Sequence, residues 1–512
     1  MTLTTRKPIA ALIADAEHGG LKRALGPGAL VLLGIGAIIG AGIFVLTGNV
    51  AAQNTGPALV VSMVLAGVAC AFAGLCYAEL ASMIPVAGSA YTYAYATMGE
   101  FMAWVIGWDL VLEYSLASAT VALGWGANAV SLLADLGIRV PARLTGPPGS
   151  SVTLADGSIT TTLFNLPAAL VVLVITALLV VGVKESARTN TVIVFIKLAV
   201  LILFVGFAVW YVRPELWQPL IPANTGTFGE FGWSGVVRGA GIIFFAYIGF
   251  DAVSTAAQEA RNPQRDLPIG ILGSLAICTV AYIAVALVMT GVVHYSRLNV
   301  PDPINVAIAA TGTTWLGPFV KIGALAGLFS VILVNLMAQP RIFFAMSRDG
   351  FLPPAFGRIH PRFRTPHVTT ALTGILVAFT AALFPINVLG QLVSMGTLLA
   401  FAIVCAGVVV LRRTDPAASR PFRAPGMPWV GIAGVLVCFY LMAVLPLATW
   451  RRLLIWLALG LAIYFAYGRR NVERMRIGSR SAERGFTADR GMRIEDSHPR
   501  GASTSSSNVP EV

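Results

Sequence analysis

The sequence has few charged residues and few of the side chains on which soluble enzymes depend. Only 11% of its 512 residues are Asp, Glu, Lys or Arg, whereas soluble domains contain about 25%. The five histidines flank the apolar runs, and the five cysteines lie inside such runs without metal-ligand or redox spacing. No acidic metal motif and no nucleophile elbow occurs. We therefore exclude a cytosolic enzyme, a disordered protein and a disulfide-rich secreted scaffold, and we expect neither a metal nor a cofactor.

Long apolar runs are abundant instead. The residues AVILMFWYC make up 57% of the chain, and glycine adds 52 residues. A helix needs about 20 apolar residues to cross a hydrocarbon core about 30 Å thick. The sequence therefore predicts an all-α integral membrane protein with 12 transmembrane helices. Their ranges are 28–51, 57–83, 101–134, 163–182, 191–212, 235–257, 268–293, 315–346, 367–384, 389–411, 427–449 and 452–468.

The distribution of positive charge predicts the orientation. With the N-terminus inside, the inner segments that precede the C-terminal tail carry 17 Lys and Arg, and the outer segments carry six. Cytoplasmic loops are enriched in these residues, so we expect both termini in the cytoplasm and the chain in the cell inner (cytoplasmic) membrane. Arg451 and Arg452, placed in an outer turn, are the exception. Residues 1–27 are charged before any apolar run begins, which argues against a cleavable signal peptide.

Two polar segments lie outside the predicted helices. Residues 135–162 read as an external loop, and residues 469–512 as a disordered cytoplasmic tail. The net charge of +12 follows from the positive inner loops and this tail. We therefore expect anionic membrane lipid as the partner of the positive charge, and no nucleic acid.

Glycines interrupt the first and the sixth apolar runs. Residues 34–44 read GIGAIIGAGIF, and residues 239–251 read GAGIIFFAYIGFD. Close helix packing through small residues is one explanation of such a pattern. The other is that both helices are broken and line a cavity, because unpaired backbone groups survive in hydrocarbon only there. The two runs occupy matching positions if residues 28–212 and 213–411 are five-helix repeats of opposite orientation, with helices 11 and 12 in residues 412–468.

Two broken helices that face each other would suit a zwitterion. Backbone N–H groups at the positive end of a helix dipole favour a carboxylate, and unwound carbonyl groups accept hydrogen bonds from an ammonium group. The candidate substrate-binding residues are Ile39, Gly40, Ala41 and Gly42 in the first run and Phe245, Ala246 and Ile248 in the sixth. An α-amino acid has both of these charged groups.

Four motifs resemble a known family. They are 38–44 (IIGAGIF), 77–91 (YAELASMIPVAGSAY), 244–251 (FFAYIGFD) and 339–350 (QPRIFFAMSRDG). The first is similar to the first-helix motif of the amino acid–polyamine–organocation (APC) superfamily, and the others to its cationic amino acid transporter (CAT) family, of bacterial type. The resemblance implies a LeuT-like 5+5 inverted repeat with broken helices 1 and 6, secondary active transport and L-amino acid substrates. A preference for neutral or cationic amino acids stays open, as does a small single-helix subunit.

Lys197 lies in the fifth apolar run, where a charge is costly and hence a functional candidate. The resemblance implies that this lysine stands where sodium-coupled relatives bind Na⁺, and that its deprotonation couples transport to protons. The alternative is a lysine whose long side chain reaches the inner membrane surface.

Acidic residues within the runs are further candidates. Asp109 and Glu113 are four residues apart and share one face of the third helix. Glu113 either binds a cationic substrate group or relays a proton, or the pair forms a polar stripe between helices. Asp251 either caps the broken sixth helix or binds substrate, and Glu79 reads as structural.

The inner end of the eighth run and the aromatic residues leave two interpretations open. The resemblance implies that Arg341, Arg348 and Asp349 form gating salt bridges, but positive-inside anchoring explains the arginines equally well. Lys321 reads as an interfacial residue at the outer end. Among the aromatic residues of both broken runs, Phe245 is our candidate for a lid over the substrate.

The sequence therefore predicts an importer of L-amino acids that works by alternating access with proton symport, and not an enzyme. An exchanger of amino acids without net proton flux is the nearest alternative. A sensor that binds without transporting is a weaker one, because the chain offers no signalling domain.

Overall fold

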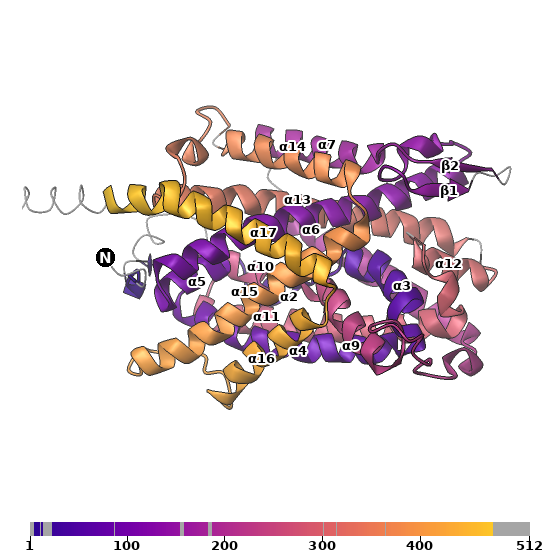
Figure 1. Ribbon diagram of the computed structural model, residues 1–512, viewed down its shortest axis with the longest axis horizontal. Coiled ribbons are helices and arrows are strands. Elements are labelled where there is room, and N and C mark those ends of the chain that lie inside the picture. The colour runs from indigo at the N-terminus through magenta and orange to yellow at the C-terminus, as the bar shows by residue number, and fades with distance from the viewer. Residues whose placement is uncertain are drawn as a thin grey trace, which may run out of the picture.

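The computed structural model describes residues 5–10, 12–13, 23–86, 88–153, 158–182, 187–300, 302–313, 315–363 and 365–474. These residues are almost entirely helical, and most helices run roughly along the longest axis of the molecule (Figure 1). The first half contains α2 (Pro27–Ile38), α3 (Thr47–Val50), α4 (Leu59–Met83), α5 (Ser89–Thr97), α6 (Glu100–Asp135), α7 (Leu166–Val181) and α8 (Ala187–Ala208). The second half contains α9 (Gly232–Ile243), α10 (Ala252–Thr255), α11 (Pro263–Val292), α12 (Pro303–Ala310), α13 (Leu316–Arg348), α14 (His367–Leu383), α15 (Ile386–Thr414), α16 (Trp429–Ala443) and α17 (Leu447–Ile463).

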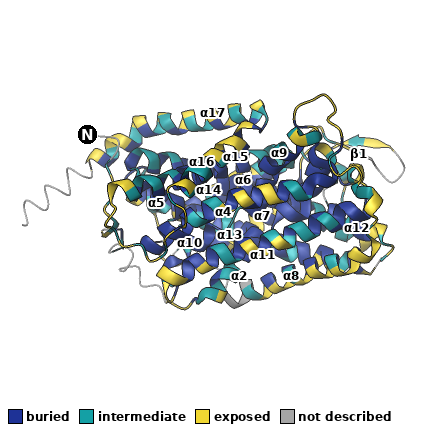
Figure 2. Ribbon diagram, turned by 90° about the horizontal axis from the view of Figure 1, so that it is seen from below, coloured by how far each residue is buried: buried dark blue, intermediate teal, exposed yellow. Residues whose placement is uncertain are grey.

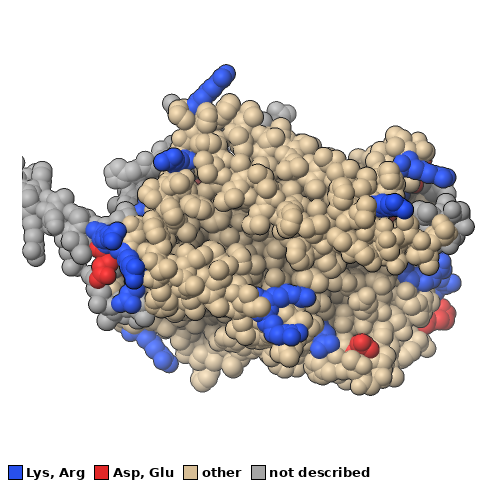
Figure 3. Space-filling model, turned by 45° about the horizontal axis from the view of Figure 1, so that its top comes forward, with Lys and Arg blue, Asp and Glu red and all other residues tan. Residues whose placement is uncertain are grey.

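The helices have the length and composition of membrane spans. Eight helical stretches of the described chain are apolar and long enough to cross a bilayer, and four shorter apolar helices, α2, α7, α14 and α16, accompany them. Large apolar side chains remain exposed along outer helices such as α8 and α17 (Figure 2). Charged side chains on the face seen in Figure 3 lie toward its two ends and in one group near the middle of its lower edge. The protein is therefore a multi-pass membrane protein, while the count of 12 spans and the inverted repeat stay predictions.

Three local features differ from the sequence interpretation. The segment 135–162 contains a short antiparallel hairpin, β1 (Ser151–Thr153) with β2 (Ile159–Thr161). Arg451 and Arg452 lie in α17 and not in a turn, because that helix already begins at Leu447. The short helices α5 and α12 lie outside the predicted ranges, since each is too short to give a strong periodic signal. Most of the predicted C-terminal tail, from residue 475 onward, lies outside the described residues.

The helices pack in two groups that are joined by long helices. One group contains α2, α4, α9 and α11, and the other contains α6, α7, α13 and α14. Helix α8 packs on α2, α11 and α13, and α15 packs on α4, α6 and α16, so both contact each group. We call the end of the molecule at which residues 5–13 lie the inner end, and the end that carries the β-hairpin the outer end (Figure 1).

Candidate functional site

The first glycine-rich segment breaks its helix. Helix α2 ends at Ile38, and Ile39 has an extended backbone with φ −72° and ψ 99°. The chain re-enters a helical conformation after Gly40, with a π-helical turn over Gly42–Leu46. The carbonyl groups that the break leaves without helical partners accept hydrogen bonds from side chains, among them Tyr282 Oη at 3.0 Å from the Ile38 oxygen.

The second glycine-rich segment breaks its helix as well. Helix α9 ends at Ile243, a 3₁₀ turn covers Phe244–Tyr247, and Ile248 is extended with φ −62° and ψ 137°. Gly249 then has φ +123°, a conformation that L side chains rarely adopt. Helix α10 follows in the same direction toward the inner end.

The two breaks touch each other. A Cβ atom on Gly42 would lie 2.3 Å from the Cα atom of Ala246, and one on Gly249 would lie 2.7 Å from the carbonyl of Ala37. Glycine is therefore needed at both positions for the backbones to approach so closely. Gly40 differs, because its Cβ would make only ordinary contacts, with the Val331 side chain at 3.5 Å and the Ile38 carbonyl oxygen at 3.9 Å.

A small chamber lies between the two breaks. Its volume is about 30 Å³, which is room for about two water molecules. The lining comes from both broken helices and from α6 and α13, and consists of Ala37, Ile38, Gly40, Ala41, Gly42, Glu113, Tyr114, Ala117, Val121, Phe245, Ile248, Gly249, Asp251, Ala252, Val331 and Asn335. Since the chamber is smaller than any amino acid, it has to widen before it admits one.

Most of the predicted substrate-binding residues meet at this chamber. Seven of the nine line it: Gly40, Ala41, Gly42, Phe245, Ile248, Glu113 and Asp251. Ile39 and Ala246 are not among the lining residues, but they lie in the two interrupted segments themselves. Sequence reasoning missed Asn335, although an amide within an apolar run is a recognisable signal, and it missed Tyr114, which carries no such signal.

The acidic side chains of the chamber, Glu113 and Asp251, are buried and poorly paired, and so is Asp109, which lies outside the lining. Glu113 and Asp109 are each 1% exposed, and none of their carboxylate oxygens has a hydrogen-bond partner among the described residues. Asp251 accepts long hydrogen bonds from Tyr114 Oη at 3.3 Å and from Ser89 Oγ at 3.5 Å, and its side chain does not cap α10. A buried carboxylate without partners is costly, so these groups are suited to binding a proton or a cationic substrate group.

Lys197 lies beside the first break and not at the inner membrane surface. Its side chain is fully buried, and its Nζ donates to the carbonyl oxygens of Gly36 at 2.7 Å and Ile39 at 3.1 Å. The alternative of a lysine that reaches out to the surface is therefore wrong. Space for the aliphatic part of the side chain comes from Gly327 on α13, where a Cβ would lie 2.9 Å from the lysine Cγ.

The aromatic residues of both breaks separate into one that lines the chamber and four that pack elsewhere. Phe245 lines the chamber. Phe244 and Phe250 pack against Phe401, and Tyr247 donates a hydrogen bond to the Met63 carbonyl at 2.8 Å. Phe44 is buried and lies outside the lining.

Comparison with known proteins identifies the family. Residues 25–463 match the family model described as "Amino acid permease". The chain belongs to the amino acid permease family. This permease is 46% identical to the methylthioribose transporter of Bacillus subtilis over 92% of its own length and 98% of the relative's. It is also 46% identical to the branched-chain amino acid permease BcaP of the same organism, over 91% of this chain and 97% of the relative. A vacuolar cationic amino acid transporter 4 of Arabidopsis thaliana is 39% identical over 76% of this chain and 63% of the relative. The resemblance to APC-superfamily transporters is thus confirmed.

Glu79 anchors an inner loop of the permease. It is 1% exposed, and its carboxylate accepts two hydrogen bonds from Arg412, at 2.9 and 2.6 Å, and one from the backbone N–H of Ala424 at 2.8 Å. Arg420 lies 3.6 Å from the same carboxylate. These contacts are structural, as expected, because they fasten the segment between α15 and α16 to α4.

The remaining charged candidates are divided between the two ends of the permease. At the inner end, Asp349 accepts a hydrogen bond from Tyr91 Oη at 2.7 Å and lies 3.4 Å from Lys7 Nζ. Neither Arg341 nor Arg348 forms an ion pair with another described residue, in contrast to the gating salt bridges that the resemblance implies for them. At the outer end, Lys321 is 8% exposed and pairs with Asp135 at 2.5 Å.

Proposed function

We propose that this permease imports L-amino acids across the cytoplasmic membrane by alternating access, coupled to protons. Its family and its relationship to BcaP support amino acid transport. The observation that carries the proposal is the meeting of two helix breaks at one chamber whose walls include Glu113 and Asp251.

The backbone supplies binding groups of both signs. The amides of Gly40, Ala41 and Gly42 begin the second part of the first broken helix, at the positive end of its dipole, and they would hold the substrate carboxylate. Carbonyl groups around Phe245 and Ile248, where helical hydrogen bonding stops, would accept from the substrate ammonium group. Glu113 and Asp251 would strengthen the attraction for this positive charge.

Phe245 would act as the lid of the chamber. It stands on the broken segment itself, so its position changes with the backbone around it. The chamber has room for about two waters. Displacement of the Phe245 ring would give an amino acid side chain room.

The arrangement of the helices supports alternating access by two repeats. Helices one, two, six and seven of the predicted spans form one packing group, and helices three, four, eight and nine form the other. Equivalent helices of two five-helix repeats would divide in this way. The repeats would rock about the chamber, with the contacts of Asp349 closing the inner end and the termini on the cytoplasmic side.

Lys197 would couple this movement to protons. Its ammonium group replaces helical donors at two carbonyl groups of the first break, so its charge holds the end of α2 in place. Loss of the proton would leave an uncharged amine, whose hydrogen bonds to the two carbonyl groups are weaker, and would loosen the break. Proton-coupled symport follows if this happens once in each cycle.

Exchange of one amino acid for another is the second candidate. It needs the same chamber but no change of charge on Lys197. Uptake into empty vesicles under an imposed pH gradient separates the two, because an exchanger needs substrate on both sides.

A thermal-shift panel with the purified full-length protein tests the binding part of the proposal. The probes are the twenty L-amino acids, and for each one that binds, its amide and its N-acetyl derivative, together with methylthioribose. Binding stabilises the folded state by mass action, so the melting temperature should rise with at least one free amino acid and with neither derivative. Stabilisation by methylthioribose alone, which has neither a carboxylate nor an ammonium group, would contradict the proposal.

A further inference from the structure

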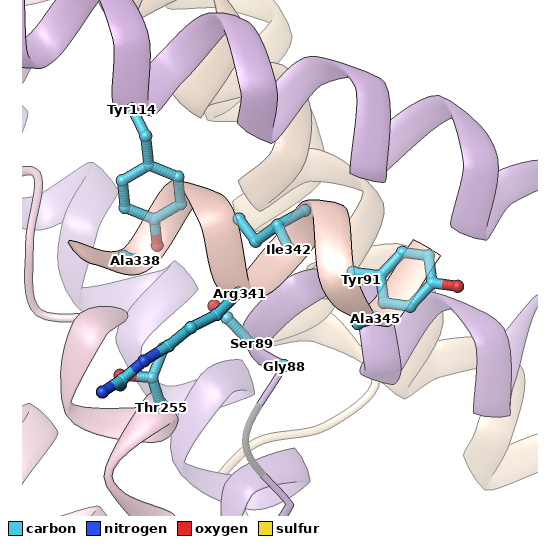
Figure 4. A pocket seen from close by; sticks show the side chains of 9 residues that line it. All are labelled: Gly88, Ser89, Tyr91, Tyr114, Thr255, Ala338, Arg341, Ile342 and Ala345. Atoms are coloured by element: carbon cyan, nitrogen blue, oxygen red, sulfur yellow. The ribbon is translucent and has the colours of Figure 1, made fainter. Parts of the chain in front are cut away.

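A second cavity adjoins the chamber on its inner side. It has a volume of about 60 Å³ and lies between the start of α5, helix α6, the end of α10 and helix α13 (Figure 4). The lining consists of Gly88, Ser89, Tyr91, Tyr114, Thr255, Ala338, Arg341, Ile342 and Ala345. We call this cavity the inner vestibule.

A thin polar wall separates the inner vestibule from the chamber. Tyr114 lines both cavities, and its hydroxyl donates to Asp251, which lines the chamber. Ser89 lines the vestibule and donates to the same carboxylate at 3.5 Å. Since both hydrogen bonds are long, the wall is weak, and a substrate that leaves the chamber inward would pass between these three side chains.

The inner vestibule contains one guanidinium group that the described protein does not pair. Arg341 extends from α13 into the cavity toward Thr255 (Figure 4). No described residue forms an ion pair or a hydrogen bond with it, and Glu259 attracts it without a direct contact. The Arg341 side chain is exposed, so a group that borders the vestibule can also be reached from the inner end.

The chemistry of the vestibule favours a carboxylate. A guanidinium group binds a carboxylate through two parallel hydrogen bonds, and this geometry is stronger and more specific than a contact with a single-atom anion. The hydroxyl groups of Ser89 and Thr255 already donate to the Asp251 carboxylate and the Ala252 carbonyl, so the guanidinium group of Arg341 supplies the donors for an anion. No acidic side chain is among the described residues that line the vestibule, and the Asp251 carboxylate lies behind the hydroxyl groups of Tyr114 and Ser89, which donate to it.

We infer that the inner vestibule is a second, transient substrate site, in which Arg341 holds the α-carboxylate of an amino acid as it passes between the chamber and the inner end. The site rests on the proposed function, because it needs an amino acid as cargo. It gives the permease a binding step that is reached from the inner face. The affinity for substrate at the inner face therefore depends on Arg341, and the affinity at the outer face does not.

Transport measured separately from the two faces tests this inference. Right-side-out and inside-out membrane vesicles that contain the full-length protein give the half-saturation concentration for uptake at each face. The variants are Arg341→Gln, Arg341→Lys, and the control Arg358→Gln, which removes an exposed positive charge from the loop that follows α13. Arg341→Gln should raise the inner-face value tenfold or more and leave the outer-face value within twofold. Arg341→Lys should give a rise of a few-fold, and the control none.

Added anions separate a carboxylate site from a general anion site. Acetate should compete with inner-face uptake by the unmodified protein and not by Arg341→Gln, and chloride should compete with neither. Equal competition by chloride would overturn the assignment to a carboxylate.

The remaining outcomes are also decisive. Unchanged values at both faces, or equal rises at both, would overturn the inference while leaving the proposed function intact. If Arg341→Gln does not reach the membrane, Arg341→Lys decides by the same comparison of faces. Absence of amino acid uptake by the unmodified protein would instead overturn the proposed function itself, and with it this site.

Discussion

Single buried charges carry most of the functional argument. Lys197, Glu113 and Asp251 stand at the two breaks or in the chamber between them, where a charge without a task would be costly. Sequence reasoning found all three because a charge in a long apolar run is conspicuous. It could not find that Lys197 contacts Gly36 and Ile39, since these contacts join the fifth predicted span to the first across the fold.

Replacement of Lys197 should uncouple uptake from protons. Lys197→Ala removes the donor from the carbonyls of Gly36 and Ile39, so we expect uptake driven by a pH gradient to fall to background. Uptake of labelled amino acid into vesicles of low internal buffer concentration measures this. Lys321→Ala is the matched control, because Lys321 is the other buried lysine of the spans but bonds to Asp135 at the outer end. Undiminished proton-driven uptake by Lys197→Ala would contradict the proposed coupling.

The contacts of Glu79 with Arg412, Arg420 and the Ala424 amide should stabilise the folded protein. Glu79→Ala removes the acceptor of two Arg412 N–H groups and of the Ala424 amide, and the negative charge beside Arg420; removal of one partner from a buried pair costs about 3–5 kcal/mol. We expect about 3 kcal/mol, because the Arg412 side chain stays 27% exposed. Lys321→Met, which leaves without its partner only the Asp135 carboxylate that is 41% exposed, should cost less than about 1 kcal/mol. Thermal unfolding in detergent compares the two variants. Equal losses of stability would argue against a stabilising role of the Glu79 contacts.

Among the elements, the two broken helices determine where the site lies. Their glycines can be recognised in the sequence. So can the equivalent places of the two segments, as the first and the sixth apolar runs. Two explanations of those glycines, close packing and helix interruption, stayed open in the sequence. The structure shows that they apply together, since Gly42 and Gly249 permit close approach at the breaks themselves. What sequence could not supply is which aromatic residue faces the chamber, because all five lie on buried backbone and only the local turn decides their direction.

The difference between Gly40 and Gly42 gives an element-scale prediction. Gly42→Ala would place a methyl group 2.3 Å from the Ala246 Cα and push the two breaks apart, so we expect uptake to be lost. Gly40→Ala makes only ordinary contacts, with the Val331 side chain at 3.5 Å and the Ile38 carbonyl oxygen at 3.9 Å, and keeps the backbone amide, so uptake should be retained at a reduced level. Initial rates in vesicles, normalised to the amount of protein in the membrane, test the pair. Loss of uptake in both variants to the same extent would mean that close approach of the breaks is not what Gly42 provides.

At the scale of the whole molecule, composition alone assigned the chain to the membrane, and four motifs identified its superfamily. Composition reflects the apolar solvent around the helices, and motifs are short stretches of local sequence. Both can therefore be recognised in a single sequence without a structure. Other features depend on contacts between distant segments. They are the division of the helices into two groups, the chamber between the breaks, and the vestibule on the inner side of the chamber. The polar wall formed by Tyr114, Asp251 and Ser89 is of this kind, since the three residues come from α6, the sixth span and α5.

Uptake by the purified protein in liposomes tests the central claim most directly. The claim is that the chamber between the two broken helices carries an amino acid across the membrane together with a proton. With an acidic exterior and an empty interior, the account predicts that the amino acid found by thermal shift accumulates inside. It also predicts that a protonophore abolishes the accumulation and that Gly42→Ala prevents it. Uptake that needs a preloaded amino acid and ignores the pH gradient would establish exchange in place of symport. No uptake under either condition, by folded protein that binds the same amino acid, would contradict the account.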